Sequence, residues 1–210
     1  MSTTKRTGAR AGVRTPSRDV ESALVDAAEA VLVRDGPGAV TVRAVAVEAG
    51  VAPMGVYNRF GSKEGLVDAL LVRGFTGLQR AVAAHGELDP LDRLRQSGVR
   101  YREFALANRE QYGVMFGGAL GAGQPSAELR TCAGAAFEEL VNHVSTGQAA
   151  GRLIPGAAQD IAQQIWSAVH GAVTLEMGGR MFADDSEVTF RALLELLIRG
   201  LSVPSDEPRR

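Results

Sequence analysis

Residues 51–66 read "VAPMGVYNRFGSKEGL". Pro53 predicts the start of a short helix, because proline is tolerated in the first helical turn, where its missing N–H has no partner in any case. Val56 and Phe60 stand four residues apart and therefore share one face of that helix. Gly61 ends the helix, and the serine that follows is a good cap for the next one. The stretch therefore predicts two helices separated by a tight break.

Two more helices are predicted before this stretch. Apolar residues at helical spacing indicate a first helix, which ends at the Gly-Pro pair of residues 36–37. Thr41 is a good N-cap for a second, short helix, and Gly50 stands where helices commonly end in a left-handed residue. Three short helices, the last two joined by a glycine turn, are typical of a helix-turn-helix. We therefore expect residues 19–64 to form a DNA-binding domain whose last helix enters the major groove.

The helix over residues 52–60 has one face for the core and one for DNA. We expect Val51, Val56 and Phe60 to be occupied by the core. Asparagine can bond adenine edges, proline and methionine can contact thymine methyl groups, and tyrosine and lysine are long enough to reach phosphates. The predicted DNA-contact residues are Thr41, Arg43, Pro53, Met54, Gly55, Tyr57, Asn58 and Lys63. The alternative is an ordinary three-helix packing unit in which Tyr57 is a core residue.

Helical spacing continues through the rest of the chain, so the predicted fold class is all-α. A helix over residues 63–75 links the DNA-binding domain to a larger helical domain over residues 76–203, and residues 204–210 are a tail. Asn108 with Gln111 resembles a capping box at the start of one of these helices.

At this point the chain resembles a known family. The segment "TVRAVAVEAGVAPMGVYNRFGSKEGLVDALL", residues 41–71, is similar to the DNA-binding domain of TetR-family transcriptional regulators. The segments "YREFALANREQYGVMF" and "WSAVHG" resemble the C-terminal domain of a subgroup with a Trp-x-x-x-His-Gly signature. The resemblance implies a homodimeric repressor that binds a palindromic operator and releases it when a small molecule enters the C-terminal domain. Two positions depart from the family pattern: Ala52 replaces the usual Ser or Thr cap, and Arg59 replaces a common histidine.

The larger domain carries the candidate ligand pocket and dimer contact. Apolar side chains with a polar handle suit a pocket wall, although plain core packing is the alternative. The pocket candidates are Phe104, Tyr112, Phe116, Trp166 and His170. The last two helices, over about 157–177 and 186–202, have apolar and small residues that suit either a monomeric core or a dimer contact around a two-fold axis. The resemblance favours the homodimer.

Charge is distributed unevenly along the chain. The whole protein has 210 residues and a formal net charge of -1. Residues 1–18 contain five basic residues and no acid, which predicts a disordered basic arm that contacts DNA phosphates or simply aids solubility. Residues 19–64 contain four basic and seven acidic residues, so the helix-turn-helix itself is not basic overall.

Other functional classes find little support in the sequence. The only cysteine, Cys132, forms no internal disulfide, and no apolar run reaches the ~18 residues of a membrane span, so a cytoplasmic protein with no membrane contact is expected. The three histidines show no metal-ligand spacing, and no phosphate-binding glycine motif occurs. We therefore expect neither an enzyme nor a bound metal or cofactor. Two rival functions remain, namely a DNA-binding regulator without a small effector and a helical interaction protein that does not bind specific DNA.

Overall fold

The computed structural model describes residues 17–83, 89–118 and 124–204. Its α-helices are α1 (Ser17–Asp35), α2 (Val42–Glu48), α3 (Pro53–Phe60), α4 (Lys63–Val82), α5 (Pro90–Ala107), α6 (Arg109–Gly117), α7 (Ala127–Ala149), α8 (Ala158–Met177) and α9 (Ser186–Leu201), with a short 3-10 turn at Pro37–Ala39. Within these ranges the only β-type pairing is an isolated bridge between Leu153 and Ser202. The all-α prediction is confirmed. The predicted basic arm lies outside the described residues as far as position 16, and so does the tail beyond position 204.

Local signals in the sequence define several helix ends. The Thr41 hydroxyl accepts a hydrogen bond from the Ala44 N–H at 3.1 Å and caps α2. Ser62 caps α4 in the same way. Gly50 has a φ of 66°, a left-handed conformation that glycine adopts without steric cost, and it turns the chain from α2 towards α3. As expected, Ala52 provides no side-chain cap for α3.

The capping box predicted at Asn108 does not form. Asn108 is both the C-cap of α5 and the residue before α6, and its side-chain N–H₂ donates to the Phe104 carbonyl of α5 at 2.8 Å. That bond turns the side chain towards the helix that ends, so it is not available to the helix that begins. Gln111 is buried in α6 instead of reaching back to Asn108.

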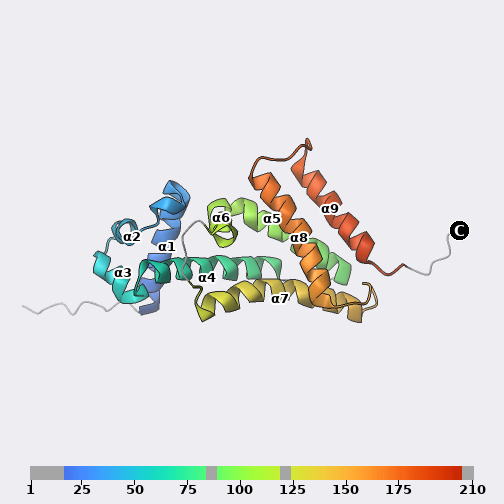
Figure 1. Cartoon of the computed structure of the whole chain (residues 1–210), viewed down its shortest axis with the longest axis horizontal. Coiled ribbons are helices and arrows are strands. Elements are labelled where there is room, and N and C mark those ends of the chain that lie inside the picture. The colour runs from blue at the N-terminus through green and yellow to red at the C-terminus, as the bar shows by residue number, and fades with distance from the viewer. Residues whose placement is uncertain (1–16, 84–88, 119–123, 205–210) are drawn as a thin grey trace, which may run out of the picture.

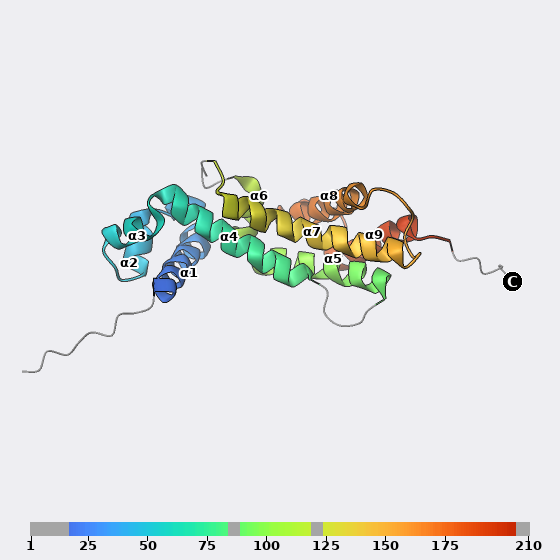
Figure 2. The same ribbon diagram turned by 90° about the horizontal axis from the view of Figure 1, so that it is seen from below.

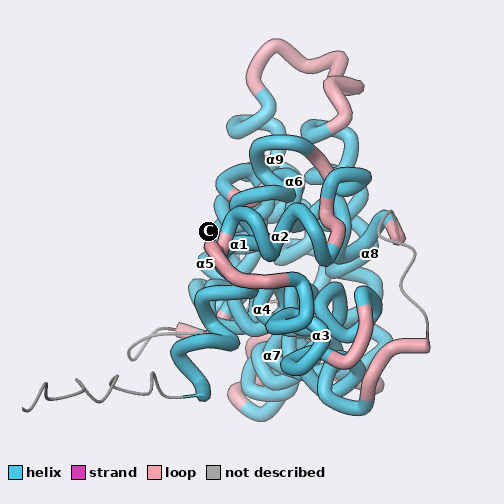
Figure 3. Tube along the Cα trace, turned by 90° about the vertical axis from the view of Figure 1, so that its left-hand side faces the viewer, coloured by secondary structure: helices cyan, strands magenta, loops and turns pink. Residues whose placement is uncertain are grey.

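The first three helices pack at one end of an elongated molecule (Figures 1 and 2). Val31 of α1, Val45 of α2, Val56 of α3 and Leu66 of α4 are all fully buried in this unit. Viewed from that end, α1, α2 and α3 face the reader (Figure 3). Burial of one apolar face from each helix therefore holds the helix-turn-helix together.

The helix that begins at Lys63 is longer than the sequence suggested and runs to Val82 instead of residue 75. Glycine is unfavourable inside a helix, but at two positions of α4 its missing side chain leaves room for neighbouring side chains. A Cβ at Gly74 would lie 2.7 Å from Met115 Sδ, and a Cβ at Gly77 would lie 3.2 Å from the Phe104 ring. Close packing against α5 and α6 therefore accounts for both glycines.

The rest of the chain forms a helical body around α4. Helices α4 and α7 run alongside each other through its length, and α8 and α9 lie side by side at the end away from α1–α3 (Figures 1 and 2). His143 of α7 is buried and bonds the Val82 carbonyl of α4 at 3.1 Å. Among the described residues, no helix is both long and apolar enough to cross a membrane.

Candidate DNA-binding surface and ligand pocket

Helix α3 presents one side to solvent. Val56 is fully buried, whereas Pro53, Met54, Gly55, Tyr57 and Asn58 are all exposed. The side chain of Met54 is 64% exposed and that of Tyr57 is 46% exposed, so Tyr57 is not a core residue. The predicted face of α3 is therefore open to a large partner.

The flanking candidates lie beside this face. Thr41 and Arg43 are exposed at the start of α2, and Lys63 is exposed at the first position of α4. All eight predicted DNA-contact residues are thus exposed at the end of the molecule formed by α2, α3 and the start of α4 (Figure 3). The arrangement brings together the N-termini of α2 and α4, which favour anions such as phosphate. Between them lies α3, and the major groove of DNA is wide enough to admit an α-helix.

Val51 differs from the sequence interpretation, and Arg59 has an ion-pair partner within the chain. Val51 was expected in the core but is 39% exposed, because it stands in the turn before α3, outside the helical periodicity on which that expectation rested. Arg59 forms an ion pair with Glu21 of α1, so it braces α3 against α1. Phe60, by contrast, is half-buried against the core as expected.

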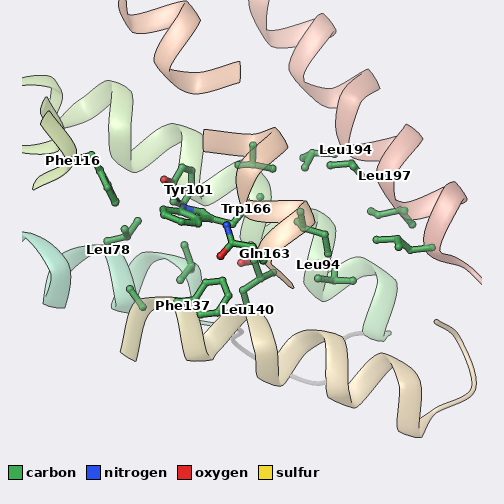
Figure 4. Close-up of a pocket in the computed structure, with 18 of the residues that line it drawn as sticks. Leu78, Leu94, Tyr101, Phe116, Phe137, Leu140, Gln163, Trp166, Leu194 and Leu197 are labelled. Atoms are coloured by element: carbon green, nitrogen blue, oxygen red, sulfur yellow. Dashed lines mark hydrogen bonds between the residues drawn. The ribbon is translucent and has the colours of Figure 1, made fainter. Parts of the chain in front are cut away.

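The helical body encloses a cavity of about 260 Å³. Figure 4 shows that the cavity is elongated, with Phe116, Tyr101 and Trp166 towards one end and Leu194 and Leu197 of α9 towards the other. The wall comes from helices α4, α5, α6, α7, α8 and α9 and consists mostly of Phe, Leu, Val, Ile and Ala side chains. Its size is slightly below the ~300–1,000 Å³ typical of small-molecule sites.

The predicted pocket residues divide into two groups. Phe116 and Trp166 line the cavity. Tyr112 and His170 do not line it but lie behind Tyr101, which does. Phe104 is also outside the lining and packs against Gly77 of α4 beside a shallow outer depression.

A hydrogen-bonded cluster stands at the aromatic end of the cavity. The Trp166 indole N–H donates to the Tyr101 hydroxyl at 3.2 Å, and that hydroxyl lies 2.8 Å from the Tyr112 hydroxyl. His170 Nδ1 is 3.0 Å from the Tyr101 oxygen and 2.7 Å from the Tyr112 oxygen. Burial lowers the pKa of His170, so its imidazole is neutral near pH 7, and burial raises the pKa of both tyrosines, so they keep their protons.

Sequence reasoning missed the residues that connect this cluster to the cavity. Tyr101 and Gln163 line the cavity, as does Phe137, whose ring centroid lies 6.1 Å from that of Trp166. Tyr101 and Phe137 lie on apolar helix faces that periodicity alone identifies as core, and Gln163 is an exposed polar residue. The sequence pointed to this cluster through Trp166 and His170, which stand one turn apart on α8. Their hydrogen-bond partner Tyr101 on α5 is 65 and 69 positions away in the sequence, so the sequence alone does not link it to them.

The comparisons with known proteins divide the chain in the same way as the structure does. Residues 24–70 match the family described as "Bacterial regulatory proteins, tetR family", and residues 94–197 match "Tetracyclin repressor-like, C-terminal domain". The chain belongs to the TetR family of transcriptional regulators. Its DNA-binding helix-turn-helix is the α1–α3 unit, and its C-terminal match covers most of the residues that line the cavity, but not those of α4.

Relatives of this TetR-family chain cover nearly its whole length. An uncharacterised HTH-type transcriptional regulator of Mycobacterium tuberculosis is 28% identical over 195 residues, which is 90% of this chain and 84% of the relative. A protein of unknown function from Rhodococcus sp. RHA1 is 29% identical, with a TM-score of 0.80 over 91% of this chain and 99% of the other. A TetR-family transcription regulator from Marinobacter aquaeolei VT8 shares the fold at 17% identity, with a TM-score of 0.68 over 90% and 99% of the two chains.

Proposed function

We propose that this protein is a homodimeric cytoplasmic repressor that binds a palindromic operator and releases it when a small molecule enters the C-terminal cavity. The observation that carries the proposal is that one helix serves both sites. Leu66 and Leu70 of α4 are buried in and next to the helix-turn-helix, and Leu78 and Val82 of the same helix line the cavity. A ligand that shifts the cavity wall therefore acts on α4 directly.

The exposed face of α3 supports the DNA-reading part of the proposal. Asn58 is exposed on this face and suits a hydrogen bond to a base edge, and Pro53 and Met54 suit apolar contact with thymine methyl groups. Tyr57 and Lys63 are exposed beside them and suit phosphate contacts. Gly55, which has no side chain, allows the backbone to approach the groove closely.

Apolar side chains on the outside of α8 and α9 support the homodimer. On α9, Phe190, Leu194 and Ile198 are buried within the chain, yet Val188 and Leu196 on the same helix are exposed, as is Leu175 on α8. A second copy related by a two-fold axis would cover these side chains with its own equivalents, forming a four-helix bundle. Two α3 helices spaced roughly 34–36 Å apart would then meet successive major grooves, which requires a near-palindromic site.

Band shifts on the DNA upstream of the gene test the DNA-reading role. Asn58→Ala should weaken operator binding about 5- to 150-fold, the equivalent of one lost base contact. Val33→Ala is the matched control, because Val33 is an exposed residue of α1 outside the proposed DNA face. Equal weakening by both variants, or none by either, would contradict the assignment of α3.

Sedimentation of the same samples tests the assembly. A dimer mass without DNA is expected, and it should fall towards the monomer when Leu196→Glu places a carboxylate in the proposed contact. A monomeric wild-type protein would refute the mechanism, since the two α3 helices would not be held at a fixed spacing. A dimer that binds the operator but ignores every small molecule bound in the cavity would favour a regulator without an effector.

A further inference from the structure

The cavity contains no partner for a charged ligand. Among the described residues, those that line it include no Asp, Glu, Lys, Arg or His. The polar side chains in the lining are Ser97, Tyr101, Gln163 and Trp166, all of which are uncharged. A carboxylate or an ammonium group inside would lose its hydration and gain no counter-ion, which is strongly unfavourable in a low-dielectric site.

The polar atoms at the aromatic end favour a hydrogen-bond acceptor. The Trp166 N–H occupies one lone pair of the Tyr101 oxygen. His170 Nδ1 needs one hydrogen, and the nearer Tyr112 hydroxyl supplies it when the imidazole proton is on Nε2. When the proton is on Nδ1, the ring itself donates. With the proton on Nε2, Tyr112 donates to His170 and the Tyr101 hydroxyl donates to Tyr112 across their 2.8 Å contact. With the proton on Nδ1, Tyr112 can donate to Tyr101 instead, and the Tyr101 hydrogen is then available for a ligand oxygen.

Of the described residues that line the cavity, the one that is exposed is also uncharged. Gln163 lines the cavity and is exposed, so it marks the side on which the cavity meets solvent, between α8 and α7. Figure 4 places its amide group between Trp166 and Leu140. The amide N–H₂ of Gln163 donates to Ser167 Oγ one turn along α8 at 3.1 Å, and no charged side chain of the lining stands beside it.

We infer that the ligand of this cavity is an uncharged, mainly apolar molecule with one neutral oxygen acceptor, such as a ketone or alcohol, that accepts a hydrogen bond from Tyr101. Only the role of this ligand as an effector rests on the proposed function. The binding preference follows from the cavity itself and is measurable without DNA.

The experiment compares three small probes of similar size: nonan-2-one, octanoate and octylammonium. Nonan-2-one and octanoate have the same number of heavy atoms and differ only in a methyl group replaced by a charged oxygen. Trp166 is the only tryptophan in the chain and lines the cavity, so its fluorescence reports occupancy directly, with titration calorimetry alongside. At pH 7.5 the ketone should bind at least about tenfold more tightly than either ion.

Variants separate the cavity from the surface. Ala136→Phe fills the cavity wall from α7 and should abolish ketone binding. Tyr101→Phe should weaken ketone binding about two- to tenfold, the worth of one neutral hydrogen bond. The control is Thr146→Ala, which removes an exposed α7 hydroxyl that bonds only the Asn142 carbonyl of its own helix and should leave binding unchanged.

Clear results would overturn the inference. If octanoate or octylammonium binds as tightly as nonan-2-one, the cavity does not select neutral ligands. If ketone binding survives Ala136→Phe, the ketone does not bind in the cavity, and the selection is not a property of the cavity. Unchanged affinity in a folded Tyr101→Phe variant would remove the acceptor assignment, and the wild-type probe series stands even if that variant fails to fold. Ketone binding with no effect on operator binding would instead refute the ligand response of the proposed function while leaving the ligand class intact.

Discussion

Two arginines on α5 make ion pairs with glutamates that differ in burial, and the more exposed one, Arg95, also pairs with Asp92. Arg102 binds Glu176 of α8 through Nε at 2.8 Å and Nη2 at 2.7 Å, and both side chains are only 14% exposed. Arg95 binds Glu195 of α9 with the same two-pronged geometry, but these side chains are 37% and 44% exposed. Replacing each glutamate by glutamine removes one negative charge with almost no change in shape.

The expected losses of stability differ accordingly. Removing one partner of a fully buried pair costs about 3–5 kcal/mol, because the other charge is left without compensation. Asp185 and Glu187 also interact with the Arg102 charge, so we expect the lower value of about 2–3 kcal/mol for Glu176→Gln. Exposed pairs are worth about 0–1 kcal/mol, and Glu195→Gln should fall in that range.

Thermal and urea unfolding at one fixed protein concentration measure both variants. For a chain of this length, 1 kcal/mol corresponds to about 2–4 °C in Tm, so Glu176→Gln should lower Tm by about 4–12 °C and Glu195→Gln by at most about 4 °C. The concentration is fixed because self-association makes Tm depend on it. Similar losses in the two variants, or a larger loss at Glu195, would refute the argument from burial.

Replacing both partners distinguishes a lost charge pair from a general defect in packing. Arg102→Met combined with Glu176→Leu removes the uncompensated charge, and such apolar replacements are often neutral or stabilising. The double variant should therefore recover most of the stability lost in Glu176→Gln. Failure to recover would mean that the contact of Arg102 with the Phe190 ring, 5.8 Å from its centroid, contributes more than the ion pair does.

Two further predictions concern backbone space and proton binding. Gly65→Ala would place a Cβ 2.1 Å from the Phe60 carbonyl oxygen, so α3 must move. We expect the free energy of unfolding, measured by thermal unfolding, to fall by about 1–3 kcal/mol or more. In Gly113→Ala the new Cβ meets no atom within 4 Å, and the free energy of unfolding should rise by about 0.5–1 kcal/mol. A loss at Gly113 as large as that at Gly65 would contradict this reasoning. The pKa of His170 is lower in the folded protein than its ordinary value of ~6.5, so just below pH 6.5 the unfolded chain binds more protons than the folded one. The free energy of unfolding should therefore be highest above pH 6.5 and fall as the pH drops towards the folded pKa. In His170→Gln this dependence of stability on pH should disappear. Urea titrations at several pH values measure the slope, and an unchanged slope in the variant would exclude His170 as its source.

Features determined by neighbouring residues were predictable from the sequence. Helix α3 begins at Pro53 and ends before Gly61 as expected, and Thr41 and Ser62 cap the helices that follow them. These signals act over three or four residues through backbone geometry and hydrogen bonding, so they do not depend on the rest of the fold. The exposed face of α3 follows from the same local periodicity once Val56 is assigned to the core.

Features that depend on how helices are placed against one another were not predictable. Periodicity identifies the apolar face of each helix but not its rotation or offset relative to a partner. The ion pair of Arg59 with Glu21 spans 38 positions, and the contact of Tyr101 with His170 spans 69. For the same reason, the sequence could not separate Phe116 and Trp166, which line the cavity, from Phe104, which lies outside the lining.

The geometry of α4 explains why a small cavity is sufficient for the proposed response. A helix of 20 residues is about 30 Å long, and the cavity-lining Leu78 lies near one end while the fully buried Leu66 lies near the other. A tilt of about 5° at the cavity would move the far end of such a rod by about 2.6 Å. In a dimer, opposite shifts of two α3 helices would add and change their separation by about 5 Å against the 34–36 Å repeat of the major groove. A coupling of about 1–3 kcal/mol between ligand and operator is therefore within reach of a ligand that displaces only a few side chains of α4.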